Sequence, residues 1–238
     1  MVEYGAGASV KTRILIDALE ELRTYIPIDI SADFLQASAT SLQEDYPDLN
    51  IDPVVADFLS AVELPEKSAE GARVGFFPGS TIGNLESSEI TGFMQRARED
   101  LGASAQFVLG ADLKKDAKIL IPAYDDSAGI TSEFNLNLLR RMNGELDANF
   151  DVASFNHEAR WNDDDARIEM HLVSDRDQSV EVSGKTFDFR QGETVHTENS
   201  RKFEIDALQK LIGQCGWQLA DSWVDKDNLF SVLLFKAI

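Results

Sequence analysis

Hydrophobic and polar positions follow two alternating periods over the first half of the chain. Short apolar runs typical of buried strands lie at 24–30, 51–56, 74–77 and 106–109. Between them, apolar residues recur at helical spacing in stretches that begin near the candidate N-caps Ser9 and Ser31 and over 87–101. The first of these stretches carries Ile14, Leu15, Ala18, Leu19 and Leu22. Strands and helices in alternation, joined by short loops, predict a parallel sheet covered by helices on both faces.

The pattern changes near residue 114. A long helix is predicted over 130–146, and its apolar positions are Phe134, Leu138, Leu139, Met142 and Leu146. Strict alternation then predicts antiparallel strands at 157–161, 167–173, 179–182 and 187–189. The chain ends with a predicted helix over 203–215 and two strands over 217–224 and 230–235. We therefore expect a seven-stranded mixed sheet built from residues 1–113 and 201–238, with residues 114–200 as an inserted lobe.

Length, charge and cysteine content limit the class of protein. The 238 residues suit one domain with a small lobe, and the formal net charge of -20 argues against nucleic acid and anionic membranes as partners. No apolar run reaches the roughly 18–20 residues that span a bilayer, and the opening residues do not resemble a signal peptide. The single cysteine, Cys215, excludes an intrachain disulfide, so a reducing cytoplasm is the expected location.

Four loops follow predicted strands, and these loops carry the candidate chemistry. They contain the turn Gly5–Gly7, Asp29, Asp57 and the segment Gly79–Asn84. Because ligands of parallel α/β sheets bind at the carboxyl ends of the strands, we expect the four loops to converge on one site.

The glycine turn is a weak signal by itself. It is compatible with a dinucleotide site, a methyl-donor site or only a tight turn. Val10 stands where the dinucleotide pattern has its third glycine, which disfavours nicotinamide cofactors. Lys11, in the first helical turn, is expected either to bind an anionic ligand group or to be a solvated surface residue.

The other loops offer a carboxylate or a ring of backbone polar groups. Asp29 is placed to accept both hydroxyls of a ribose, because Ser31 is available to cap the next helix. Asp57, next to Phe58, suits an adenine amino group, and the alternative is a loop cap. Residues 79–84 would meet a substrate amine, and the alternative is a simple turn into the next helix.

No metal site or nucleophilic triad is expected. His157, His171 and His196 show no metal-ligand spacing and are interpreted as solvated strand residues. The sequence has neither a nucleophile elbow nor a phosphate-binding P-loop. The acidic runs 125–126 and 163–165 are interpreted as solvated turns.

Several segments in order resemble one known family: EYGAGASVKTRILIDAL, YIPIDIS, ADF, FFPGSTIGNL, AYDD, FNLNLLRRMNGELDANFD, HEARWN, RIEMHL and TENSRKF. Together they resemble the histidine-specific, S-adenosylmethionine-dependent methyltransferases of ergothioneine biosynthesis over nearly the whole chain. The resemblance implies an α/β fold of class I methyltransferase type, with a Rossmann-like mixed sheet and a small inserted α+β lobe that binds substrate. It also implies three methyl transfers to the α-amino nitrogen of L-histidine, giving hercynine, by a cytoplasmic monomer that needs no metal.

The resemblance also implies roles for individual residues. The residues that it implies bind the methyl donor are Gly5, Gly7, Lys11, Asp29, Asp57 and Phe58. Around the substrate's amino and carboxylate groups it implies Gly79, Asn84 and Tyr124, and around the imidazole Met170, Glu198 and Ser200. Catalysis would rest on alignment and desolvation, with no residue acting as a strong base.

Two alternatives remain open at this stage. The scaffold could methylate another amino acid or a small amine, which the pair Glu198 and Ser200 argues against. The chain could also be a non-catalytic remnant, because family members carry an N-terminal segment and only four residues precede Gly5 here. The expectation is that either the true chain starts upstream or the protein is a truncated paralogue, with the first strand reduced to a stub.

Overall fold

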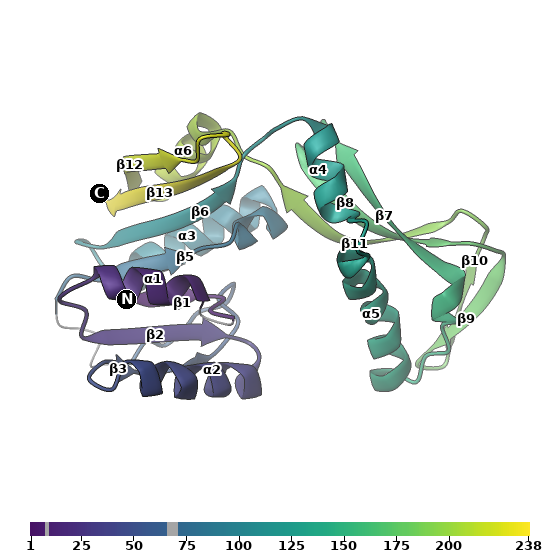
Figure 1. Ribbon diagram of the computed structural model, residues 1–238, viewed down its shortest axis with the longest axis horizontal. Coiled ribbons are helices and arrows are strands. Elements are labelled where there is room, and N and C mark those ends of the chain that lie inside the picture. Colours follow the sequence, from purple (N-terminus) through teal and green to yellow (C-terminus); the bar gives the residue numbers. More distant parts are fainter. Residues whose placement is uncertain (8–9, 66–70) are drawn as a thin grey trace. The chain divides into compact units, whose positions relative to one another are not determined.

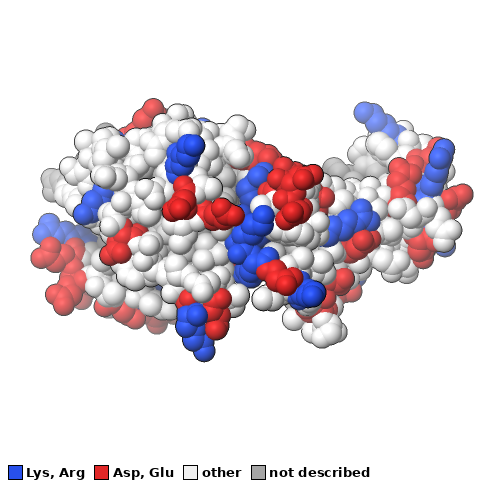
Figure 2. All heavy atoms as spheres, turned by 90° about the horizontal axis from the view of Figure 1, so that it is seen from above, with Lys and Arg blue, Asp and Glu red and all other residues white. Residues whose placement is uncertain are grey.

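The computed structural model describes residues 1–7, 10–65 and 71–238, which form two compact units (Figure 1). Unit 1 comprises Met1–Leu113 and Phe203–Ile238, and unit 2 comprises Lys114–Lys202. The inserted unit thus ends two residues after the expected boundary at 200. None of the helices in the described ranges is long and apolar enough to cross a membrane. Acidic and basic side chains are interleaved on the face shown in Figure 2.

A mixed sheet forms the centre of unit 1. Its strand order is β12-β13-β6-β5-β1-β2-β3, and β4 also pairs with β2. The strands are β1 (Val2–Tyr4), β2 (Thr24–Asp29), β3 (Asn50–Ile51), β4 (Val54–Val55), β5 (Val74–Phe77), β6 (Gln106–Asp112), β12 (Trp217–Val224) and β13 (Phe230–Ala237). Strand β1 is short but buried and pairs in parallel with both β2 and β5. The expected strand 51–56 is divided in two at Asp52-Pro53, because proline lacks the N–H that continues a ladder.

The helices of unit 1 are α1 (Val10–Ala18), α2 (Ala32–Asp45), α3 (Ser87–Leu101) and α6 (Ile205–Gly213), with the 3-10 turn η2 (Thr81–Asn84). The expected apolar face of α1 is wrong, because Ile14 is 72% exposed whereas Thr12 and Ile16 are buried. Helix α1 also ends at Ala18, before Leu22. The expected N-cap Ser9 lies outside the described residues.

Aromatic side chains hold the middle of the unit 1 core. Tyr4 of β1 packs against Phe93 and Phe107 with ring centroids 5.0 and 5.9 Å apart. Trp217 packs on Phe107, and its indole N–H donates to the Met94 carbonyl oxygen at 2.8 Å. Large rings in edge contact gain packing energy beyond their buried area. They join β1, α3, β6 and β12 into a frame from which the loops extend.

A buried carboxylate joins β1 to α1 and β2. Glu3 is only 2% exposed, and its Oε2 accepts hydrogen bonds from Thr12 Oγ1 and Tyr25 Oη, each at 2.6 Å. Burial raises the pKa of Glu3 to about 7, although both hydrogen bonds and the Lys11 charge lower it. This contact explains why α1 buries Thr12.

The raised pKa of Glu3 predicts a pH-dependent stability. Between about pH 4.5 and about 7 the unfolded chain loses the Glu3 proton while the folded chain keeps it, so the free energy of unfolding falls as pH rises. The Glu3→Gln variant cannot ionise. Its stability relative to the natural chain should therefore increase by roughly 2–3 kcal/mol from pH 5 to pH 8, at about 1.4 kcal/mol per pKa unit. Urea unfolding of both proteins at the two pH values measures this, and an unchanged difference would contradict it.

Unit 2 combines two helices with two small antiparallel sheets. Its elements are α4 (Ala117–Tyr124), α5 (Ile130–Glu145), the 3-10 turn η3 (Val152–Ser154), β7 (Phe155–Asn162), β8 (Arg167–Ser174), β9 (Gln178–Val182), β10 (Lys185–Phe189) and β11 (Thr194–Arg201). Strands β11-β8-β7 form one sheet, and β9 pairs with β10. The expected apolar face of α5 is partly wrong: Leu139 is buried, but Phe134 is 64% exposed and the polar Asn135 is buried.

Candidate functional site

The glycine turn after β1 is tied to the end of β2. Gly5 and Gly7 have φ of +66° and +50°, a region that favours glycine. The Gly5 amide donates to the Ile28 carbonyl oxygen at 2.9 Å, and the Gly7 amide donates to Asp29 Oδ2 at 3.2 Å. The turn and Asp29 therefore form one local structure, as the parallel pairing of β1 with β2 requires.

Asp29 is held by backbone donors on both of its oxygens. In addition to Gly7, its Oδ1 accepts from the Ser31 amide at 3.0 Å. Within the described residues, the Ser31 side chain makes no capping hydrogen bond. The expectation that Ser31 caps α2 in place of Asp29 is therefore wrong. The outcome is a carboxylate of fixed orientation at the carboxyl end of β2.

Asp57 and Phe58 follow β4, and the structure places Phe58 beside the glycine turn. A Cβ built on Gly5 would lie 3.6 Å from Phe58 Cε1, and the Phe58 ring packs edge-on against Phe77 at 5.2 Å. Asp57 is exposed, and its Oδ1 accepts from the Leu59 amide at 2.9 Å. That oxygen therefore caps the loop, which was the alternative interpretation of Asp57.

The loop after β5 lies next to Lys11. Gly79 has φ of +80°, and a Cβ built there would lie 3.1 Å from Lys11 Nζ. Ser80 Oγ accepts from the Asp112 amide of β6 at 2.9 Å, which anchors the loop. Asn84 ends η2 and is exposed. Unit 1 thus brings Gly5, Gly7, Asp29 and Phe58 together, and Lys11 with Gly79.

In unit 2, a β-bulge determines which way the predicted imidazole contacts face. His196 pairs with His171, but Glu198 pairs with Met170 and Ser200 with Ile168, so Thr197 is the extra residue on β11. Without the bulge, Glu198 and Ser200 would share the face of His196. With it, they lie on the face of Met170, which is 4% exposed and packs with Leu120. Bulges often re-aim side chains in this way at functional sites.

Tyr124 and Ser200 meet around a lysine that sequence reasoning missed. Tyr124 is the last residue of α4, and its Oη lies 2.7 Å from Ser200 Oγ. Lys202 is only 3% exposed and donates to Tyr124 Oη at 2.6 Å and to Ser200 Oγ at 2.9 Å. Its Nζ also lies 4.5 Å from the centre of the Tyr124 ring. A lysine is rarely buried this deeply unless it is paired, and here it joins two predicted substrate contacts.

A histidine and an asparagine fix the end of α4. His157 Nε2 lies 2.7 Å from the Tyr124 carbonyl oxygen, and Asn135 Nδ2 donates to His157 Nδ1 at 2.9 Å. These partners require a neutral ring with its proton on Nε2. The interpretation of His157 as a solvated histidine is therefore wrong, because both of its nitrogens make hydrogen bonds within unit 2. The same interpretation of His171 is also wrong, because His171 is only 6% exposed.

Comparison with known proteins places the chain in a family. The model of a family described as histidine-specific, S-adenosylmethionine-dependent methyltransferase matches residues 1–237. A histidine N-alpha-methyltransferase from Mycobacterium tuberculosis is 40% identical, over 98% of this chain and 74% of that protein. A histidine N-alpha-methyltransferase from Mycolicibacterium smegmatis is 38% identical over the same shares.

Solved structures agree on the fold. The structure of an S-adenosylmethionine-dependent methyltransferase from Clostridium acetobutylicum superposes with a TM-score of 0.57 at 12% identity, covering 99% of this chain and 82% of that one. This neighbour supports the α/β fold of a class I methyltransferase, and the family match supports an N-methyltransferase that uses S-adenosylmethionine. The chain therefore belongs to the family of histidine-specific, S-adenosylmethionine-dependent methyltransferases.

Proposed function

We propose that this protein methylates the α-amino nitrogen of L-histidine three times and releases hercynine, the first step of ergothioneine biosynthesis. The observation that carries the substrate assignment is the face of β8 and β11 on which Glu198 and Ser200 lie beside Met170. A carboxylate and a hydroxyl two residues apart on one face suit the two nitrogens of an imidazole. Polar groups of this kind reject side chains that leave them unpaired.

The donor-side residues fit an adenosyl ligand. A Cβ built on Gly7 would find its nearest described neighbour, the Gly5 carbonyl oxygen, 3.9 Å away, so the turn leaves room for a ligand. We assign the ribose hydroxyls to the fixed carboxylate of Asp29, the adenine to Asp57 and Phe58, and the donor carboxylate to Lys11. Gly5 and Gly7 expose backbone beside the ligand. S-adenosylmethionine supplies the reactive methyl group on a sulfonium.

We assign binding of the substrate's amino and carboxylate groups to Gly79, Asn84 and Tyr124. The Lys202 ammonium holds the Tyr124 hydroxyl and adds positive charge next to it. We assign Lys202 as a positioning residue: it sets Tyr124 and Ser200 at a fixed separation before the substrate arrives. Preorganised polar groups lower the cost of binding because fewer side chains must be ordered.

Methyl transfer needs alignment more than acid–base catalysis. In each transfer the amine nitrogen attacks the methyl carbon in line with the departing sulfur, a new N–C bond forms and the S–C bond breaks. Overall, an ammonium and three sulfonium donors give a trimethylammonium, three thioethers and three protons, which leave to solvent. The residues named above therefore act by orienting the amine and excluding water.

The substrate is a small molecule, and the acidic charge of -20 gives no reason to expect nucleic acid or membrane partners. We propose a cytoplasmic monomer, which size-exclusion chromatography with light scattering checks.

Replacing Lys202 tests the preorganisation of the substrate side. Lys202→Met removes the hydrogen bonds to Tyr124 and Ser200 while it keeps most of the side-chain volume. Without Lys202 the substrate must order the Tyr124 and Ser200 side chains on binding, at about 0.5–1.5 kcal/mol each, so KM for histidine should rise roughly 5- to 100-fold with a smaller change in kcat. The matched control is Lys185→Met on the exposed strand β10. A fall in kcat with unchanged KM would contradict a positioning role.

The proposed reaction has a direct test. The protein is incubated with S-adenosylmethionine and either L-histidine or Nα-acetyl-L-histidine, and the products are fragmented in a mass spectrometer. We expect up to three methyl groups on the α-nitrogen of histidine and none on the acetylated compound. Methyl groups on the imidazole of either compound would overturn the assignment.

A further inference from the structure

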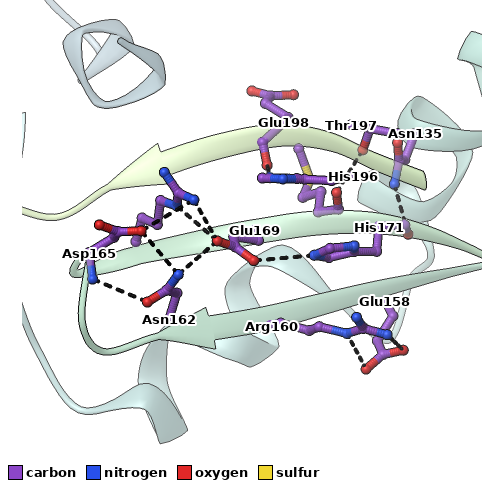
Figure 3. A network of polar contacts seen from close by, with 12 residues as sticks. Asn135, Glu158, Arg160, Asn162, Asp165, Glu169, His171, His196, Thr197 and Glu198 are labelled. Atoms are coloured by element: carbon purple, nitrogen blue, oxygen red, sulfur yellow. Dashed lines mark hydrogen bonds and ion pairs between the residues drawn. The ribbon is translucent and has the colours of Figure 1, made fainter. Parts of the chain in front are cut away.

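The face of the β11-β8-β7 sheet opposite Met170 and Glu198 carries a network of polar side chains, beside which Glu158 and Arg160 form a separate pair (Figure 3). Besides Asn199 and Arg201, the polar side chains that alternation along the strands places there include these seven: Glu158, Arg160, Asn162, Arg167, Glu169, His171 and His196. In Figure 3 Glu198 points away from this network. The function proposed above uses none of these seven residues.

Two histidines and a glutamate converge within this network. His171 and His196 lie opposite each other on β8 and β11, with ring centroids 4.8 Å apart and an 18° angle between the rings. Glu169, two residues before His171, lies on the same face, and its Oε2 is 3.4 Å from His171 Nε2. One nitrogen or oxygen from each of the three residues lies within 4.8 Å of the other two. Residues i and i+2 of one strand plus a cross-strand partner thus bring three donor atoms together.

Hydrogen bonds from two neighbours orient the Glu169 carboxylate. Glu169 Oε1 accepts from Asn162 Nδ2 and from Arg167 Nε, each at 2.9 Å, while Oε2 faces His171. Partners that fix a carboxylate from behind are typical of the outer shell of metal sites.

His171 offers a lone pair that no protein donor reaches. Its side chain is 8% exposed, and Nδ1 is buried without a hydrogen-bond partner among the described residues. A buried polar atom left unpaired is costly, and native structures contain few of them. A ligand that accepts electron density from the imidazole would remove that cost.

We propose that Glu169, His171 and His196 bind a divalent first-row transition-metal ion of the Zn²⁺ class. Two imidazoles and one carboxylate are a ligand set that such ions prefer over Mg²⁺ or Ca²⁺, which take oxygen ligands. Ligand bonds of about 2.0–2.2 Å require the donor atoms to move closer together. His196 is exposed, and its ring makes one hydrogen bond of 3.2 Å to the Glu198 carbonyl oxygen, so it is the ligand that can turn inward.

The neighbouring arginines do not rule out a cation. Arg160 makes two hydrogen bonds with Glu158, at 2.9 and 2.8 Å, and Arg167 also pairs with Asp165 at 3.3 Å. Arg201 of β11 lies opposite Arg167 and belongs to the same group. With three carboxylates, three arginines and neutral histidines the local charge is zero, so no net positive charge opposes the ion. A metal joining β8 to β11 at His171 and His196 would hold the strands together next to the bulge that orients Glu198. Metal binding should therefore raise the melting temperature of the whole protein.

Titration of the full chain with ZnCl₂ tests the proposal. We expect one equivalent bound with a Kd in the micromolar range, with the melting temperature rising in parallel. His196→Ala and Glu169→Gln should each weaken binding at least tenfold, and Val195→Ala, the neighbour on the opposite face of β11, should not. Circular dichroism checks that the variants are folded.

The competing outcome is non-specific binding of zinc by carboxylates on the acidic surface. Weak binding of several zinc ions that is equal in all four proteins would mean that surface carboxylates hold the metal, and it would overturn the proposal. No binding at all would overturn it as well. A methylation assay is not needed for either conclusion, so the proposal stands or falls independently of the proposed enzymatic function.

Discussion

Replacing Glu198 with alanine should lower kcat/KM for L-histidine by about 10- to 100-fold. The carboxylate is assigned to one imidazole nitrogen, and a hydrogen bond between charged or strongly polar partners is worth about 1.5–3 kcal/mol when its loss leaves a buried group unpaired. Selectivity should fall with it, because the same loss removes the penalty for substrates without an imidazole. Steady-state kinetics with histidine and with tryptophan measure both effects.

The control for this variant is Glu181→Ala. Glu181 is the same residue type, lies exposed on β9 of the same unit and is assigned no role in binding. Its kinetics should match those of the natural chain. If Glu198→Ala and Glu181→Ala have the same kcat/KM for histidine, the face carrying Met170, Glu198 and Ser200 does not bind the imidazole.

Replacing Asp29 with alanine should weaken binding of the donor by about 100-fold or more. The carboxylate is assigned two ribose hydroxyls, and charge-assisted hydrogen bonds contribute about 1.5–3 kcal/mol each. Asp29→Asn keeps one acceptor oxygen for the loop and should lose roughly tenfold. Isothermal titration with S-adenosylhomocysteine, the demethylated donor, gives both affinities without any turnover.

Asp29 also holds the glycine turn, so stability must be measured beside affinity. Its oxygens accept from the Gly7 and Ser31 amides, and the alanine variant loses both bonds. Asp33→Ala, an exposed carboxylate in the first turn of α2, is the matched control. Donor affinity equal in Asp33→Ala and Asp29→Ala would show that Asp29 does not contact the ribose.

Element order and loop placement could be predicted from the sequence because they rest on local periodicity. Strand β5 and helix α3 have the expected bounds. The carboxyl ends of β1 and β2 meet at Gly7 and Asp29, as parallel pairing requires. The buried face of α1 could not be predicted, because it follows from a hydrogen bond between Thr12 and Glu3 and not from hydrophobicity.

The details of unit 2 depend on strand register, which local pattern does not specify. One extra residue, Thr197, decides whether Glu198 faces Met170 or His171. Helix α4 contains Pro122, an ordinary helix breaker, and so gives no helical signal. The cluster of Glu169, His171 and His196 could not be predicted for the same reason. The two histidines are remote in sequence and become neighbours only when β8 pairs with β11.

The most direct test of the central claim is a competition among substrates. The chain is incubated with S-adenosylmethionine and an equimolar mixture of the twenty amino acids, and every methylated product is identified by mass spectrometry. We expect histidine alone to gain one, two and three methyl groups, with hercynine accumulating last. Methylation of a different amino acid in preference to histidine, or of none, would contradict it.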